Sequence, residues 1–191
     1  NTTLAIGAGL ADSCAACHGR PRGSAGFGGD VVTRPDSRDA PHLFGLGLKE
    51  MLADEMTADL RAIRADALAA AQAAGKPQVR QLTTKGIAFD QITARPDGTF
   101  DTSLVEVGDP ELRVRPFFAH GETISIREFV VGALHAEMGL QAVDPMLASA
   151  VNGARVTTPS GMVLDGATDT IEAPPATDIN SDPDADGIRN E

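Results

Sequence analysis

Apolar positions recur at three- and four-residue spacing through the middle of the chain. From residue 48 the recurring positions are Leu52, Met56, Leu60, Ile63 and Ala67. This spacing is the period of one helix face. Gly75, followed by Lys76-Pro77, is a typical helix stop. The pattern therefore predicts an amphipathic helix that ends at Gly75.

Two short stretches with β-branched and aromatic residues follow this helix, at residues 87–92 and 100–107. Pro96, Asp97 and Gly98 lie between them and are residues that favour tight turns. The pattern predicts a small β-hairpin.

A second helix is predicted from Ser125. Glu128 follows Ser125 at the spacing of a capping box, and apolar residues continue to Gly139, about four turns later. At 100° per residue, one apolar arc of this helix contains Ile126, Phe129, Val130, Ala133 and Leu140.

Glu137 falls inside the same arc, whereas His135 and Met138 project toward the other side, where His135 neighbours Glu128. A carboxylate buried without a partner has a raised pKa, which is what a general acid or base needs. The alternative is that Glu137, near the helix end, reaches solvent or an arginine. Both interpretations stay open at this point.

Composition changes after Val151, where Thr, Pro, Gly and Asp dominate and no aromatic residue occurs. We therefore expect a folded domain over residues 1–150 and an extended surface segment over residues 151–191. Asp182, Asp184, Asp186, Gly187 and Asn190 match the first nine positions of a calcium-binding loop, although the Glu expected at position 12 is missing. The segment is predicted to be either a calcium site, completed by further sequence or another chain, or a solvated acidic tail.

The whole-chain composition narrows the class of protein. With 191 residues, 42% of them hydrophobic, the chain can bury one real core. It has seven Phe but neither Trp nor Tyr, so a buried macrocycle would fill a core that lacks large side chains. A net charge of −11 argues against nucleic acid or an anionic membrane as partner and favours a basic or neutral redox protein.

No apolar run is long enough to span a membrane. The N-terminus lacks the basic and apolar regions of a signal peptide, so we expect Asn1 to be a processed or trimmed start.

The two cysteines lie in one motif, Cys14-Ala-Ala-Cys17-His18. This is the attachment motif of haem c, in which both thiols add to the haem vinyl groups and the histidine binds the iron. A zinc site would need a second ligand pair and a thioredoxin-like site would need a βαβ pattern, and the sequence has neither. A buried structural pair is the remaining alternative. Covalent haem implies a periplasmic or extracellular location, as expected of c-type cytochromes.

After a glycine-rich loop at residues 19–41, the segment Pro41-His-Leu43-Phe-Gly resembles the Pro-x-Leu segment that follows the haem motif in many c-type cytochromes. The resemblance implies that the Pro41 carbonyl accepts the second ring proton of His18 and that Leu43 packs on the haem. Such a bond fixes the tautomer of the ligand. An ordinary loop entering a helix is the alternative.

Three segments in order resemble the RNxPxL, FFxxGRxxSL and EMG segments of bacterial di-haem cytochrome c peroxidases, and most closely the di-haem oxidoreductase branch. They begin at Arg38, at Phe117 and at Glu137. The resemblance covers roughly residues 10–145. It implies that Arg38 belongs to the haem surroundings and that Glu137 is the acid–base group of a peroxidatic pocket. The sequence departs from that family because it has no second CxxCH motif and no His in the loop at residues 19–40.

The distal ligand of the iron stays open. His120 lies in the matched FFAHG segment and His42 lies beside Pro41, whereas Met51 and Met56 are better explained by the apolar stripe of the first helix.

These observations predict a mainly α-helical, cytochrome c-like domain with a small β-hairpin and an extended C-terminal segment. The expected function is single-electron transfer by one covalent haem c. The expected partner is a redox protein or a further haem domain. The chain is also expected to form a homo- or hetero-oligomer. Two alternatives remain: a peroxidase-type oxidoreductase that uses Glu137, and a structural haem module joined to neighbours through calcium.

Overall fold

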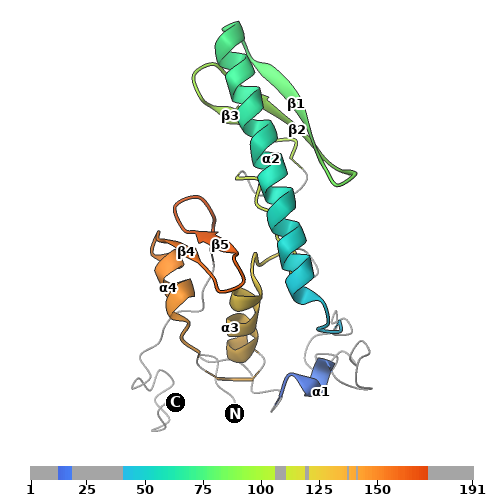
Figure 1. Cartoon of the computed structure of the whole chain (residues 1–191), viewed down its shortest axis with the longest axis vertical. Helices are drawn as coiled ribbons and strands as arrows, with labels where there is room; N and C mark the ends of the chain where they lie inside the picture. Colours follow the sequence, from blue (N-terminus) through green and yellow to red (C-terminus); the bar gives the residue numbers. More distant parts are fainter. Residues whose placement is uncertain are drawn as a thin grey trace.

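A computed structural model of the chain describes residues 13–18, 41–105, 111–118, 121–136, 138–140 and 142–171. One long helix, α2 (Leu46–Ala74), forms its spine (Figure 1). Gly75 ends the helix in the left-handed conformation (φ 62°), and its N–H bonds back to the carbonyls of the last turn. The predicted helix and its glycine stop are confirmed.

A three-stranded antiparallel sheet packs on the C-terminal half of α2. Its strands are β1 (Gln78–Thr84), β2 (Ile87–Ala94) and β3 (Phe100–Asp101), in that order. The hairpin between β2 and β3 is confirmed in outline, although β3 is much shorter than expected. β1 was missed, because its alternating polar side chains hide its strand character.

The turn between β1 and β2 is made by Lys85 (φ 51°) and Gly86 (φ 80°). Positive φ at both central residues gives the turn a twist that matches the two strands. We call α2, the three strands and residues 111–114 the sheet lobe. Its apolar core consists of Met56, Leu60, Leu82, Phe89, Ile92 and Leu112.

The C-terminal lobe contains two helices, α3 (Ile126–Ala136) and α4 (Pro145–Val151), and a two-stranded hairpin of β4 (Arg155–Thr157) and β5 (Val163–Asp165). In Figure 1 it lies beside the N-terminal half of α2. Its core is a second apolar cluster, which consists of Ile124, Val131, Leu147, Ala150, Met162, Leu164 and Ile171.

The expected mainly α-helical fold is wrong. In the described ranges the chain is an α/β mixture with two antiparallel sheets. The expected extended C-terminal segment is also wrong as far as Ile171, because β4 and β5 carry Leu164 into the core. The boundary at residue 150 stays a prediction, since residues 172–191 lie outside the described ranges.

The second predicted helix is confirmed as α3, but its buried face differs from the expected arc. Val131 is buried (7% exposed), whereas Val130 and Leu140 are 45% and 43% exposed. Ser125 accepts a hydrogen bond from the Glu128 N–H at 3.0 Å, as the capping box predicts. The Glu128 carboxylate bonds to the N–H of Ile124, one residue before the cap, which explains its burial.

Candidate functional site

The Cys-Ala-Ala-Cys-His motif forms a single helical turn, α1 (Ala15–His18). The His18 N–H donates to the Cys14 carbonyl at 2.9 Å, which closes the turn. The Cys14 thiol is free and exposed, and the side chain of Cys17 lies outside the described part of the structure.

His18 contacts the loop that precedes α2. Its Nδ1 lies 2.6 Å from the carbonyl oxygen of Pro41. Since a carbonyl only accepts hydrogen bonds, Nδ1 carries the proton, and the lone pair of a neutral ring is then on Nε2. The contact implied by the Pro-x-Leu resemblance is therefore present, and it leaves Nε2 free to bind a metal ion.

Large apolar side chains are exposed along the same loop and on the first turns of α2. We call this set the apolar band; it consists of Leu43, Phe44, Leu48, Met51 and Leu52, with exposed fractions between 38% and 72%. The His42 ring lies 6.1 Å from the Phe44 ring. A continuous run of such residues on a surface typically marks a binding site.

The exposed fractions of Met51 and Leu52 contradict the prediction that both belong to the apolar stripe of the first helix. Met51 (56% exposed) and Leu52 (47% exposed) do not belong to the core stripe, whereas Met56 (6% exposed) does. Met56 is therefore excluded as a distal ligand by its place in the sheet-lobe core. Within the described ranges, no hydrogen bond or ring contact joins Met51 or His42 to His18.

Three phenylalanines lie where α3 approaches the start of α2. The Phe129 ring lies 6.0 Å from the Phe117 ring and 5.0 Å from the Phe118 ring. Lys49 Nζ lies 5.7 Å from the Phe117 ring centre, in cation–π range. Phe118 has a φ of 62°, which is unusual for a bulky residue, and its side chain is 46% exposed.

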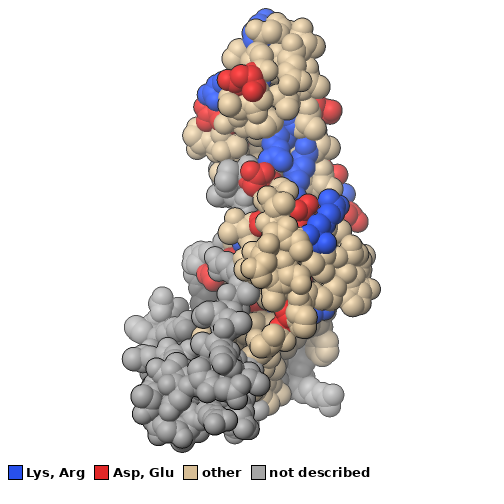
Figure 2. Space-filling view, turned by 90° about the vertical axis from the view of Figure 1, so that its left-hand side faces the viewer, with Lys and Arg blue, Asp and Glu red and all other residues tan. Residues whose placement is uncertain are grey.

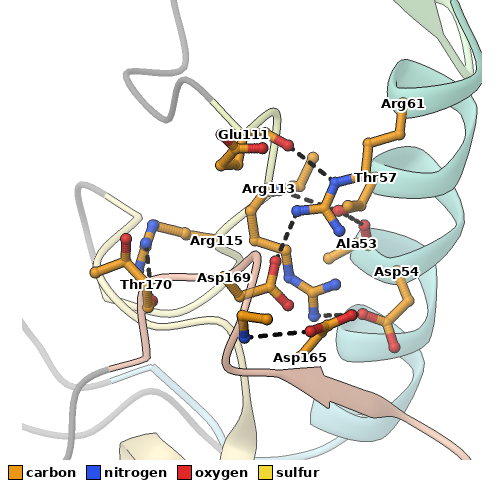
Figure 3. Close-up of polar contacts among 12 residues, drawn as sticks. Ala53, Asp54, Thr57, Arg61, Glu111, Arg113, Arg115, Asp165, Asp169 and Thr170 are labelled. Atoms are coloured by element: carbon orange, nitrogen blue, oxygen red, sulfur yellow. Dashed lines mark hydrogen bonds and ion pairs between the residues drawn. The ribbon is translucent and has the colours of Figure 1, made fainter. Parts of the chain in front are cut away.

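A second cluster of functional groups was not predicted from the sequence. Arg61 donates to Asp169 at 2.6 Å and to the Glu111 carbonyl at 2.9 Å, and Arg113 donates to Asp54 at 2.7 Å (Figure 3). Figure 2 shows Lys and Arg side chains next to Asp and Glu side chains midway along one face of the molecule, with further charged side chains toward its upper end. These pairs join segments that are 50 or more residues apart, so no local pattern could reveal them.

Glu50, one helical turn before Asp54 on α2, is a further buried charged residue of this region. It is 6% exposed, and its carboxylate accepts a hydrogen bond from the Ile126 N–H, at the start of α3, at 2.6 Å. Burial raises the pKa of Glu50, partly offset by the Ile126 hydrogen bond. Burial also raises the pKa of Asp54, against the opposing effect of Arg113. One sequence signal existed: Glu50 lies at helical spacing from Ala53 and Thr57, which are both buried.

Several predicted site residues cannot be placed. Arg38, His120 and Glu137 lie outside the described residues, as does the calcium-loop candidate of Asp182, Asp184, Asp186 and Asn190. Within the described ranges, no three His, Cys, Asp or Glu side chains are grouped so as to hold a metal ion. In the same ranges no helix combines the length and the apolar character needed to cross a membrane, in agreement with the sequence.

Comparison with known proteins gives no match to any protein-family model, curated protein or solved structure. The resemblance to the di-haem peroxidases therefore rests on the sequence segments alone.

Proposed function

We propose that this chain is a c-type cytochrome domain that holds one covalent haem and transfers single electrons. The observation that carries the proposal is the pairing of the Cys-Ala-Ala-Cys-His turn with the Pro41 carbonyl. Cys14 and Cys17 would hold the macrocycle through thioether bonds, and His18 would bind the iron through Nε2. The bound haem supplies an iron that cycles between two oxidation states.

The residues present fit such a group. Cys14 is a free, exposed thiol, as an attachment residue must be before the haem is added. Pro41 fixes the orientation of the His18 ring and strengthens it as a ligand. The apolar band follows Pro41 directly in the chain and supplies the apolar surface that a macrocycle needs.

Electron transfer is proposed ahead of peroxide reduction because the two rest on different residues. The electron-transfer reading needs the three motif residues and Pro41, of which the structure describes the turn and the contact. Peroxide reduction needs Glu137, which lies outside the described ranges. The acidic chain favours a basic or neutral redox partner, and the haem chemistry favours a location outside the cytoplasm.

The test is to produce the full chain in cells that attach haem to CxxCH motifs. We expect the intact mass to exceed that of the polypeptide by one haem, and the colour to stay with the protein on acid–acetone extraction. The double variant Cys14→Ala/Cys17→Ala should lose covalent haem completely. The variant His42→Ala, at an exposed histidine of the adjacent loop, should keep it. Extraction of all colour from the unaltered protein would sink the proposal.

Cyanide separates the two redox functions once haem is attached. A haem that only transfers electrons should bind cyanide weakly and slowly, whereas an open catalytic iron should bind it tightly and fast. Tight, fast binding would overturn the electron-transfer proposal and favour peroxide reduction.

A further inference from the structure

The two lobes have separate apolar cores. The sheet-lobe cluster and the C-terminal cluster share no residue. Two polar contacts join α2 to the C-terminal lobe: the Glu50 carboxylate accepts from the Ile126 N–H, and Arg61 donates to Asp169, each at 2.6 Å. We call the region of these two contacts the seam. Because apolar burial is the main force that holds lobes together, a seam whose charged groups lie outside both apolar clusters is weaker than either core.

Some buried polar atoms in and near the seam also have no hydrogen-bond partner. Among the described residues, the buried side-chain atoms without a hydrogen-bond partner are Arg113 Nε, Thr123 Oγ1 and Asp169 Oδ2. Asp169 is part of the seam, Arg113 pairs with Asp54 one turn along α2 from Glu50, and Thr123 lies three residues before Ile126. A buried polar atom without a hydrogen-bond partner costs free energy, and opening of the seam exposes these atoms to solvent. The closed seam therefore carries a cost that opening relieves.

We propose that the seam is a hinge at which the C-terminal lobe swings away from α2 as one body, and that Glu50 sets how often it opens. The inference goes beyond the proposed function and does not depend on haem. Glu50 controls the hinge because its carboxylate caps the N-terminus of α3 from another element, so the contact must break whenever the lobe leaves. It lies in the first half of α2, close in sequence to the apolar band.

The charges around Glu50 give the hinge a pH dependence. Asp54 on the same helix opposes the ionised form of Glu50, whereas Arg113 and Arg127 favour it, and burial outweighs them and raises the pKa. In the open state Glu50 is hydrated and has its ordinary pKa. The closed state therefore binds the proton more tightly, so closure is favoured in acid and is weakened as pH rises through the raised pKa.

Hydrogen exchange measured segment by segment on the full chain tests the hinge. Protection factors, which correct for the intrinsic pH dependence of exchange, are compared between about pH 5 and about pH 8. We expect α3, α4, β4 and β5 to lose protection together at the higher pH, while β1 and β2 keep theirs. Different behaviour of α3 and the β4–β5 hairpin would overturn the hinge, since it would show that the lobe does not move as one body.

Three variants test the role of Glu50. Glu50→Gln keeps an oxygen for the Ile126 N–H but carries no charge, so it should raise C-terminal-lobe protection at the higher pH by about threefold or more and abolish the pH effect. Glu50→Ala removes the acceptor and should lower that protection at every pH. Asp59→Asn is the matched control: Asp59 lies on α2, and its partners among the described residues are Thr84 and Lys85 of the sheet lobe, so the seam should not respond.

Two outcomes would overturn the proposed role of Glu50. Faster exchange of the C-terminal lobe in Glu50→Gln than in the unaltered protein would overturn the role of Glu50, since the charge would then hold the seam closed. An equal change in Asp59→Asn would also overturn it, because the effect would then belong to the charge of α2 as a whole. Unchanged β1–β2 protection shows that each variant is folded.

Discussion

The guanidinium of Arg61 lies 2.6 Å from the carboxylate of Asp169, 108 residues away in the chain. The Asp169 side chain is 1% exposed, whereas that of Arg61 is 24% exposed. Arg61→Leu therefore leaves a buried carboxylate without its partner and should lower the free energy of unfolding by about 3 kcal/mol. Urea denaturation followed by circular dichroism measures this, since the chain has neither Trp nor Tyr for fluorescence.

The double variant Arg61→Leu/Asp169→Leu is the control for this pair. It removes both charges, so it should be clearly more stable than Arg61→Leu alone. Equal stability of the two variants would show that the unpaired Asp169 carboxylate does not cause the loss. The loss would then be assigned to the hydrogen bond from Arg61 to the Glu111 carbonyl.

Gly166 tests whether the segment after residue 151 is folded against α4. A Cβ added to Gly166 would lie 1.7 Å from the Ala150 carbonyl oxygen, so backbone would have to move. We expect Gly166→Ala to destabilise the protein by about 3 kcal/mol, at the upper end for overpacking. Gly161→Ala, in the turn between β4 and β5 and with open space around its Cβ, should cost only about 1 kcal/mol for its positive φ. Equal effects of the two substitutions would contradict the close packing.

The His18–Pro41 contact predicts the tautomer of the free imidazole. With Nδ1 donating to the Pro41 carbonyl, the neutral ring should carry its proton on Nδ1. Nitrogen-15 chemical shifts of the ring, measured on protein without haem above about pH 8, distinguish the two tautomers. His42, which is exposed and whose ring lies near that of Phe44, serves as the internal comparison. A proton on Nε2 of His18 would contradict the contact and remove the main support for iron binding.

The sequence predicted local structure better than long-range structure. The α2 stop at Gly75, the cap at Ser125 and the β2–β3 turn all depend on residues close in the chain, and all three are present. The fold class failed because β1, β4 and β5 are short or polar strands whose pairing depends on packing with α2 and α4. Composition made residues after 151 resemble a linker, although Leu164 there is fully buried.

The residues of the candidate site also fall into those that local sequence predicts and those that only the fold reveals. The motif residues were predicted because their spacing is itself the signal, and Pro41 because it follows the motif in a known arrangement. The seam was missed since Arg61 and Asp169 are ordinary charged residues until the fold brings them together. The exposed band was missed because Leu52 has the spacing of a core residue, and spacing alone does not say what covers a helix face.

Asp144 gives the C-terminal lobe its own sensitivity to acid. Its carboxylate caps α4 by accepting from the N–H groups of Met146 and Leu147, both at 3.0 Å, and it pairs with Arg127. Burial raises the pKa of Asp144, but these hydrogen bonds and the arginine outweigh it, so the net pKa is lowered. A lowered pKa contributes stability above the unfolded-state value, and that stability is lost as pH falls through the folded-state value.

Asp144→Asn isolates this contribution, because asparagine keeps the cap but not the charge. At neutral pH the variant should be less stable than the unaltered protein by about 1 kcal/mol. The difference should shrink as pH falls below about 4 and vanish once Asp144 is protonated in both the folded and unfolded states. Urea denaturation of both proteins over that range measures the difference, and the other carboxylates cancel because they are common to both. A difference that stays constant between neutral pH and about pH 3 would show that the side chain acts through its shape rather than its charge.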